Sequence, residues 1–187
     1  MRNSLNKHQN QKMKHIKVLN NPKTEKYTLL KNSVCSRTFP WFWDDTTTAQ
    51  HHEKYDNFGF YFHGILIRPS PGSYYCKENS NLTSIASEVI EEILTFNNIN
   101  LNIIYRISVN CVHSTERNDY SVPHKDHDHL DHKNLLIYYT DCNGGDTKVK
   151  EDTYLGKEDD VITWDSQIHQ YRPPSKNRRI VLVATYL

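Results

Sequence analysis

The sequence predicts a mainly β domain with flanking helices, and three observations support this fold class. Short runs of apolar or alternating residues, typical of strands, recur along the chain and are most regular between residues 101 and 187. Turn sequences separate these runs, such as RPSPGS at 68–73 and DCNGGD at 141–146. One segment, Leu82–Phe96, has the apolar spacing of an amphipathic helix. We therefore expect about seven or eight short strands with one or two helices.

The individual elements follow from these patterns in chain order. Asn57–Ile67 is apolar on both faces and is expected to form an internal strand. The single apolar stripe of Leu82–Phe96 predicts a helix that packs against the outside of the sheet. In Leu101–His113, apolar residues alternate with polar ones, and the pattern favours a polar face in solvent over one that turns Arg106 and Asn110 toward a site. Further strands are expected at Leu135–Thr140, Thr147–Tyr154 and Val161–Trp164.

An aromatic cluster surrounds Pro40, in the sequence RTFPWFWDD at 37–45. It contains Phe39, Trp41, Phe42 and Trp43. Aromatic side chains bury a large area per residue, so this pattern favours packing of the segment onto the body. A substrate groove is the alternative.

Length and charge limit the organisation of the chain. A chain of 187 residues is long enough for one domain with a substantial core. Residues 1–26 contain seven Lys and Arg residues and one acid, a charge of +6, so the remainder carries −5. We expect residues 1–26 to form a flexible basic arm and residues 27–187 to form a single domain.

The sequence also predicts a soluble, cytoplasmic protein. No run of 18 apolar residues is present, and residues 1–26 lack the apolar core of a secretory signal. The four cysteines are widely spaced with no CxxC pair, which indicates reduced thiols.

Candidate metal ligands are concentrated in the segment YSVPHKDHDHLDH at 120–132. His124 and Asp126 are two residues apart, so in an extended segment both side chains project from the same face. A third ligand must come from elsewhere, and His169 is the only histidine in the last quarter of the chain. Two histidines and one carboxylate on one side of an ion leave its other side open, as in the facial triad of non-haem Fe(II) oxygenases.

The same segment offers a second His-x-Asp pair, His129 and Asp131. We favour His124 and Asp126 because this choice leaves a loop before the strand at 135–140. The pattern indicates that His127 and His129 lie in a solvated loop. Adventitious binding of Zn²⁺ or Ni²⁺ is the alternative for the whole segment, since imidazole suits several metals.

A guanidinium near the end of the chain adds to this constellation. Arg179 precedes the strand-like run IVLVATY at 180–186, and its fork could bind a carboxylate through two hydrogen bonds. Arg178 is the rival for this position. Taken together, HKD at 124–126, IYYTDCNGGDT at 137–147, DSQIH at 165–169 and RPPSKNRRIVLVATY at 172–186 resemble the Fe(II)- and 2-oxoglutarate-dependent dioxygenases. The most similar branch is the prolyl 4-hydroxylase type, including phage-encoded versions, and the resemblance covers about half of the chain, from Leu101 onward.

This resemblance implies a double-stranded β-helix, the jelly-roll or cupin-like barrel. It implies Fe²⁺ on His124, Asp126 and His169, with 2-oxoglutarate and O₂ as cosubstrates and ascorbate as a reductant. It also implies that Arg179, Tyr139 and Thr147 bind 2-oxoglutarate, with Tyr139 reaching the distal carboxylate, and that His132 supports the site or faces the substrate. For Tyr139 a core position in a strand is the alternative, and for Thr147 a structural role. Trp164 is most simply interpreted as a residue of the hydrophobic core.

The reaction implied by the resemblance is hydroxylation of a C–H bond with release of succinate and CO₂. A peptidyl proline or another protein side chain is the implied substrate, and a small molecule is the alternative. In a phage, the protein would act in the host cytoplasm. Two other classes of function stay open: a metal-binding but non-catalytic cupin-like module, and a nucleic-acid-binding protein that uses the basic arm, which the absence of interleaved aromatic residues disfavours.

Overall fold

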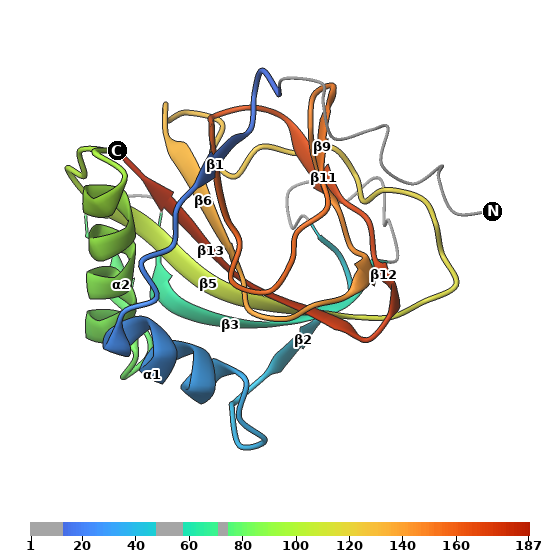
Figure 1. Ribbon diagram of the computed structural model, residues 1–187, viewed down its shortest axis with the longest axis horizontal. Coiled ribbons are helices and arrows are strands. Elements are labelled where there is room, and N and C mark those ends of the chain that lie inside the picture. Colours follow the sequence, from blue (N-terminus) through green and yellow to red (C-terminus); the bar gives the residue numbers. More distant parts are fainter. Residues whose placement is uncertain (1–12, 48–57, 71–74) are drawn as a thin grey trace.

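A computed structural model describes residues 13–47, 58–70 and 75–187 (Figure 1). Within these residues the chain forms two helices and 13 strands. The helices are α1 (Glu25–Val34) and α2 (Thr83–Phe96). The strands are β1 (Lys17–Leu19), β2 (Phe42–Asp44), β3 (Phe60–Ile67), β4 (Lys77–Glu78), β5 (Ile104–His113), β6 (Lys133–Tyr138), β7 (Asn143–Gly144), β8 (Thr147–Val149), β9 (Asp152–Tyr154), β10 (Val161–Asp165), β11 (His169–Tyr171), β12 (Pro174–Lys176) and β13 (Arg178–Tyr186).

The strands form one large and two small antiparallel sheets. The large sheet has the order β1-β10-β6-β13-β5-β3-β2, with β4 added at β3. The small sheets are β11-β8-β9 and β12-β7. Figure 1 shows α1 and α2 on one side of the large sheet and the small strands on the other. The predicted jelly-roll with flanking helices is therefore confirmed, although the sheets stay separate and do not close into a continuous barrel.

Strand alternation separates the two faces of the large sheet. On β13, Ile180 and Leu182 belong to the apolar cluster beneath the helices, whereas Val181 and Val183 face the small sheets. Arg179 shares the face of Val181 because successive side chains of a strand point to opposite sides. The side chains on the inner face of the large sheet, which point toward the small sheets, are therefore the ones that can contribute to a site.

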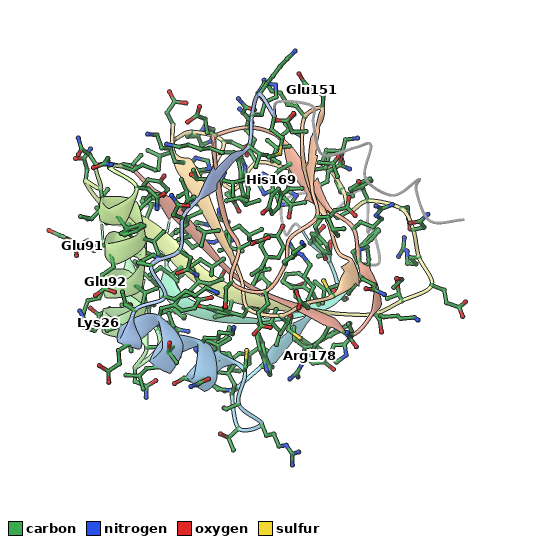
Figure 2. The ribbon with its side chains drawn as sticks, viewed as in Figure 1. Lys26, Glu91, Glu92, Glu151, His169 and Arg178 are labelled. Carbon is green, nitrogen blue, oxygen red and sulfur yellow. The ribbon has the colours of Figure 1, made fainter. Side chains whose placement is uncertain are left out.

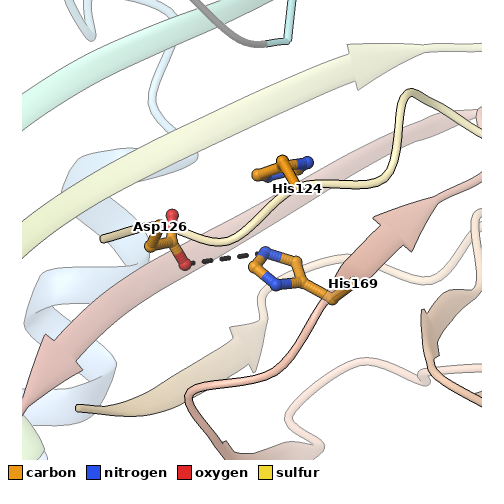
Figure 3. Close-up of side chains that lie close together, drawn as sticks. All are labelled: His124, Asp126 and His169. Carbon is orange, nitrogen blue, oxygen red and sulfur yellow. Dashed lines mark ion pairs between the residues drawn. The ribbon is translucent and has the colours of Figure 1, made fainter. Parts of the chain in front are cut away.

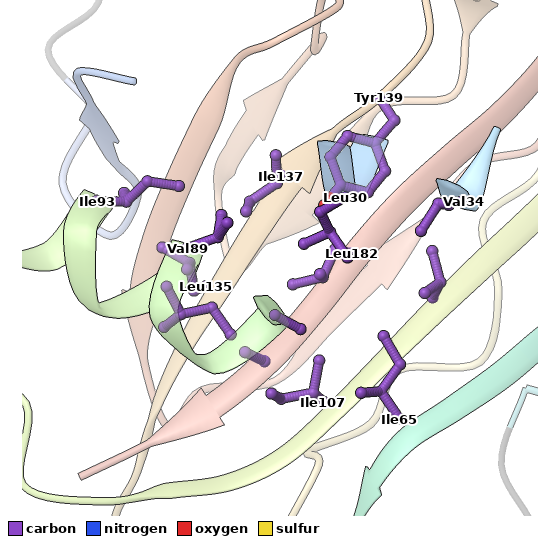
Figure 4. Packing of buried hydrophobic residues seen from close by; sticks show 14 of the residues in the cluster. Leu30, Val34, Ile65, Val89, Ile93, Ile107, Leu135, Ile137, Tyr139 and Leu182 are labelled. Atoms are coloured by element: carbon purple, nitrogen blue, oxygen red, sulfur yellow. The ribbon is translucent and has the colours of Figure 1, made fainter. Parts of the chain in front are cut away.

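The two helices cover the outer face of the large sheet. Helix α2, predicted from its apolar stripe, begins one residue later than expected and buries its stripe against β3 and β5 (Figure 4). Helix α1 was not predicted. Its N-cap residue is Thr24, whose side chain accepts a hydrogen bond from the main-chain nitrogen of Tyr27 at 3.2 Å. Its buried residues, Tyr27, Leu30 and Val34, form a narrow stripe that the polar residues between them obscure in the sequence.

The predicted basic arm is too long. Strand β1 pairs with β10, and Ile16 and Leu19 are buried, because two apolar side chains and a row of edge hydrogen bonds hold this stretch on the sheet. Lys26 forms ion pairs of 2.9 Å with Glu88 and Glu92 on α2 (Figure 2). Residues 13–26 therefore belong to the folded body, and the rest of the predicted arm, residues 1–12, lies outside the described residues.

The aromatic cluster at residues 37–45 is only partly packed onto the body, and its four aromatic side chains are not among the residues that line the cavity described below. Phe39 is buried against the edge of Trp41, with ring centroids 4.7 Å apart, as expected for packing. Phe42 and Trp43, on β2, are 55% and 58% exposed. The segment is therefore anchored at its start and presents two aromatic side chains at its end.

In the described parts of the chain, neither helix has the length and apolarity that a membrane crossing would need. The four cysteines are free, in agreement with their spacing.

Asp159 connects the start of the chain to the loop before β10, and this network gives a testable prediction. Its carboxylate accepts hydrogen bonds from Lys31 at 2.5 Å and Tyr27 at 2.6 Å, and forms an ion pair with Lys23 at 2.9 Å. Partial burial alone would raise the pKa of Asp159, but these partners outweigh it and lower the pKa to about 2. Because the folded pKa is depressed, the stabilisation is complete above the unfolded pKa and is lost as the pH falls through the folded value.

We expect Asp159→Asn to lower the free energy of unfolding by about 1–2 kcal/mol at pH 7. The difference from the wild type should shrink between about pH 4 and pH 2, where the wild type also loses the charge. Denaturant unfolding at several pH values measures this. Asparagine tolerates the positive φ of 70° at this position, so strain should not contribute. Glu158→Gln, which removes a more exposed partner of Lys31, is the control and should cost less than about 0.5 kcal/mol. If the difference in free energy of unfolding between the wild type and Asp159→Asn stayed the same at low pH, the loss of stability would not come from the charge of Asp159.

Candidate metal and cosubstrate site

The structure brings together the three residues that the sequence analysis selected as metal ligands. One nitrogen or oxygen atom each from His124, Asp126 and His169 lies within 4.8 Å of the others (Figure 3). Nε2 of His169 is 3.5 Å from Oδ2 of Asp126. The first two residues come from the segment before β6, and the third begins β11. Residues 45 positions apart therefore converge on one point.

Main-chain hydrogen bonds fix this convergence. His124 and His169 form an isolated antiparallel bridge with N–O distances of 3.1 and 2.9 Å. Nδ1 of His124 is 3.0 Å from the carbonyl of Val122, and Nδ1 of His169 is 3.1 Å from the carbonyl of Gln167. A carbonyl only accepts, so each Nδ1 carries the proton and each Nε2 is left with a lone pair for a metal.

The protonation states also suit a metal. Burial lowers the pKa of His169 to about 4, so this imidazole is neutral at pH 7. Burial alone would raise the pKa of Asp126, but the charge of Arg106 and the neighbouring imidazoles outweigh it and hold the pKa well below its usual range. His169 and Asp126 therefore offer a neutral imidazole and an ionised carboxylate, the species that metals bind.

Two further side chains hold Asp126 in place, and a third supports one of them. Nη1 of Arg106 is 3.0 Å from Oδ1. The amide of Asn134, oriented to satisfy both of its neighbours, donates to Oδ2 at 2.7 Å and accepts from Nε1 of Trp164 at 3.0 Å. The ring of Trp164 also contacts the edge of His169, with centroids 5.2 Å apart. Such supporting contacts orient metal ligands in proteins.

Sequence reasoning undervalued these supporting residues. The polar face of β5 was expected in solvent, but Arg106 and Asn110 line the cavity, because the small sheets cover this face. Trp164 was assigned to the core and is buried, but it also lines the cavity. Asn134 was missed, although a polar residue inside an apolar strand was an available signal.

The remaining histidines of the segment do not join the metal group. His129 and Asp131, the rival pair, are exposed, as expected for a solvated loop. His127 is instead buried, which corrects the prediction: its Nε2 lies 2.9 Å from the hydroxyl of Thr185. His132 is also buried and packs against His127, with ring centroids 4.7 Å apart. Neither His127 nor His132 is among the residues that line the cavity.

One cavity of about 340 Å³ contains both the metal group and Arg179. Arg179 is only 4% exposed; its Nε donates to the carbonyl of Gly145 and its Nη2 to the hydroxyl of Thr147, both at 2.9 Å. Gly145 adopts a φ of +74°, which glycine permits, and thereby presents its carbonyl. Arg178 is exposed, so Arg179 is the arginine that the fold directs inward. Thr147 lines the cavity beside it.

The structure corrects the tyrosine expected to reach the cosubstrate. Tyr139 packs beneath the helices, 6.0 Å from the ring of Tyr27, and does not line the cavity. Tyr138 lies on the inner face, with its hydroxyl 2.8 Å from that of Thr147 and its ring 5.3 Å from the Arg179 guanidinium. The two neighbours point to opposite faces; neither lines the cavity, and Tyr138 is the one that lies against Thr147 and Arg179.

Because Tyr138 and Tyr139 lie on opposite faces, we expect their matched variants to have different effects. Tyr138→Phe leaves the hydroxyl of Thr147 with one partner fewer beside Arg179, so the KM for 2-oxoglutarate should rise by about 3-fold to 10-fold. Tyr139→Phe removes a buried hydroxyl that has no partner among the described residues, so it should leave KM unchanged and not lower the free energy of unfolding. Steady-state kinetics and denaturant unfolding measure the two effects. The reverse order would restore Tyr139 as the cosubstrate residue.

Comparison with known proteins agrees with this architecture. No protein-family model matches the chain, and no curated protein matches its sequence. Among solved structures, a 2OG-Fe(II) oxygenase family oxidoreductase from Burkholderia pseudomallei matches with a TM-score of 0.63 at 13% identity, over 86% of this chain and 76% of that chain. A prolyl hydroxylase from Trichoplax adhaerens, in complex with a hypoxia inducible factor oxygen degradation domain peptide fragment, matches with a TM-score of 0.63 at 13% identity, over 92% of this chain and 83% of that chain.

A third structure is the viral collagen prolyl hydroxylase of Paramecium bursaria Chlorella virus 1, in its 2OG complex. It matches with a TM-score of 0.56 at 12% identity, over 92% of this chain and 96% of that chain. The likeness extends over most of each protein. The chain therefore has the fold of the 2OG-Fe(II) oxygenases and, among them, resembles the prolyl hydroxylases.

Proposed function

We propose that this chain is an Fe(II)- and 2-oxoglutarate-dependent dioxygenase that hydroxylates a C–H bond. The single observation that supports this most strongly is the cavity itself: it contains the His124, Asp126 and His169 group together with a buried arginine, Arg179. A zinc site of the structural kind would use four protein ligands, whereas this group offers three. Three ligands on one side of an ion suit a reaction that needs the remaining positions.

The residues fit the iron and the cosubstrate that the fold implies. His124 and His169 would bind the metal through Nε2, since Nδ1 of each is already bonded to a carbonyl. Asp126 would bind through Oδ2, the oxygen that lies 3.5 Å from Nε2 of His169. When bound, Fe²⁺ with 2-oxoglutarate and O₂ supplies the oxidation of a substrate C–H bond, with release of succinate and CO₂.

The other side chains would bind and orient the cosubstrate. Nη1 of Arg179 makes no hydrogen bond to any described residue, so it is available to a carboxylate, while Gly145 and Thr147 fix the rest of the guanidinium. Leu136 and Val183 contribute apolar walls that exclude water. Exclusion of water strengthens the attraction between the guanidinium and a bound carboxylate.

A peptidyl proline or another protein side chain is the proposed substrate. The support is that the Trichoplax prolyl hydroxylase, which shares the fold, is in complex with a peptide. The cavity of this chain is also lined by Phe60 and Phe62 of β3, which could contact an apolar side chain.

Release of succinate from 2-oxoglutarate tests the proposal without knowledge of the substrate. The purified chain with Fe²⁺, ascorbate and 2-oxoglutarate should form succinate slowly, and chelation of the metal should stop it. A metal-binding but non-catalytic module would bind Fe²⁺ and form none. Absence of succinate from a folded, iron-loaded protein would therefore reject the enzyme and favour the module.

A further inference from the structure

The cavity has a guanidinium at each end of its floor. Arg179 and Arg106 both line it, and the pairing of β13 with β5 relates their positions. Arg179 lies opposite Val112, whereas Arg106 lies opposite Thr185, six residues away along each strand. Six residues of extended chain span roughly 20 Å between Cα atoms. One end is the proposed 2-oxoglutarate end, and the other has no role in the proposed function beyond the support of Asp126.

A second arginine joins Arg106 at that end. Arg68 follows β3 directly and lines the cavity. Its Nη1 is 2.7 Å from the main-chain oxygen of Asp126 and 3.4 Å from Nδ1 of His127. Among the described residues Arg68 pairs with no carboxylate, and Arg106 pairs with that of Asp126. The carboxylate of Asp126 is also the one that the metal would use.

The hydrogen bonding of Arg106 is also incomplete. Its Nη1 pairs with Asp126 and its Nη2 has a long contact of 3.5 Å with the hydroxyl of Ser108. Its Nε is buried and finds no partner within the described part of the chain. Buried donors in folded proteins are nearly always satisfied. An orphaned donor beside an unpaired guanidinium is what a site for a missing anion would show.

Small and aromatic residues separate this end from Arg179. Gly64 lies opposite Ser108, and Phe62 lies opposite Asn110, two residues away along each strand and on the same face. All four line the cavity. A ligand that spans this stretch would therefore contact the ring of Phe62 and the polar side chains of Ser108 and Asn110, and place an anionic group at the arginines.

We propose that Arg68 and Arg106 bind a carboxylate of the substrate whose C–H bond is hydroxylated. This carboxylate would lie at the end of the cavity opposite Arg179. This inference rests on the proposed function, because it assigns the Arg179 end to 2-oxoglutarate. A guanidinium fork matches the planar carboxylate. A polyanion such as a nucleic acid would instead need an extended basic surface, and the chain as a whole has 23 basic and 22 acidic residues. The carboxylate belongs either to an acidic residue near the hydroxylated position of a peptide or to a small organic acid.

The test measures binding without turnover. The full chain, loaded with Zn²⁺ and the inert analogue N-oxalylglycine, is titrated into two fluorescein-labelled peptides of equal length, repeats of Asp-Ala-Pro and of Asn-Ala-Pro, and fluorescence anisotropy is recorded. The two differ in charge and hardly in shape. We expect the Asp peptide to bind at least about tenfold more tightly. Arg68→Gln should reduce this ratio to less than about threefold, and Arg68→Lys, which keeps the charge but loses the fork, should retain part of it.

The ratio is taken within each variant, so a general weakening of the site cancels. Lys176→Gln is the matched control, because Lys176 is exposed and outside the cavity, and it should keep the full ratio. Direct titration of N-acetylaspartate and N-acetylasparagine by calorimetry separates the two sources. Preferential binding of N-acetylaspartate with the same dependence on Arg68, without binding of either peptide, assigns the site to a small acid. Binding of the Asp peptide assigns it to an acidic residue, and either result supports the site.

Other outcomes overturn the inference. Equal affinity for the Asp and Asn forms of both probes, or a ratio that Arg68→Gln does not change, removes the carboxylate site. Tighter binding of an oligothymidylate than of the Asp peptide replaces the carboxylate with a polyanion. Succinate formation distinguishes this failure from failure of the proposed function: a chain that forms succinate without the Asp preference disproves only the carboxylate site. A chain with the preference but no succinate disproves the enzyme.

Discussion

His124→Ala should reduce succinate formation from 2-oxoglutarate by more than about 100-fold, because it removes one of the three protein ligands that the described residues offer to the metal. The residue at position 124 also contributes main-chain bonds to His169, but alanine keeps these. The loss should therefore come from the missing imidazole. Affinity for Co²⁺, measured by titration of its visible absorption, should fall in parallel and does not depend on turnover.

His129→Ala is the matched control for this variant. It removes a histidine from the same segment, but His129 is exposed and outside the metal group. Succinate formation and Co²⁺ affinity should both stay within about twofold of the wild type. If His129→Ala abolished activity while His124→Ala preserved it, the assignment of His124 and Asp126 as the ligand pair would be wrong.

Arg179→Gln should raise the KM for 2-oxoglutarate on the order of 100-fold, since it removes the buried charge that would pair with the distal carboxylate. Glutamine can still bond to Gly145 or Thr147, so the loop should persist and thermal unfolding should change little by comparison. Arg179→Lys keeps the charge without the fork and should show an intermediate rise of about tenfold.

The neighbouring arginine provides the control. Arg178 is exposed one residue earlier in β13, and Arg178→Gln should leave the KM for 2-oxoglutarate within about twofold of the wild type. This pair tests directly which of two adjacent arginines the strand turns inward (Figure 2 shows Arg178). A large rise for Arg178→Gln and none for Arg179→Gln would mean that the strand register on which the site depends is wrong.

The ligand set could be predicted from the sequence because local spacing and chain order both constrain it. His124 and Asp126 had to share a face in an extended segment, and His169 was the one late histidine. The helix α2 was predictable for a similar reason, since its stripe repeats over four turns. Helix α1 has three buried residues separated by polar ones, too weak a pattern to distinguish from a polar segment.

Positions that depend on which face is covered were predicted less well. Arg106 and Asn110 alternate with apolar residues whether the polar face meets water or a second sheet, and only the small sheets above β5 decide between them. His127 has a polar side chain, yet the fold buries it, because the hydroxyl of Thr185 provides a hydrogen-bond partner for its ring. Tyr138 and Tyr139 differ by one position, and a strand has a period of two, so any uncertainty in register exchanges their environments.

The sequence by itself determined the mainly β character, the three metal-binding candidates and the arginine that follows them, because each depends on residue type and spacing within short segments. The tertiary structure decided that residues 13–26 belong to the body, that Tyr138 and not Tyr139 lies beside Arg179, and that Arg68 and Arg106 share one end of the cavity. These facts arise from contacts between strands far apart in the chain, which no local pattern encodes, since a side chain's partner across a sheet is set by register and by the layer that covers it.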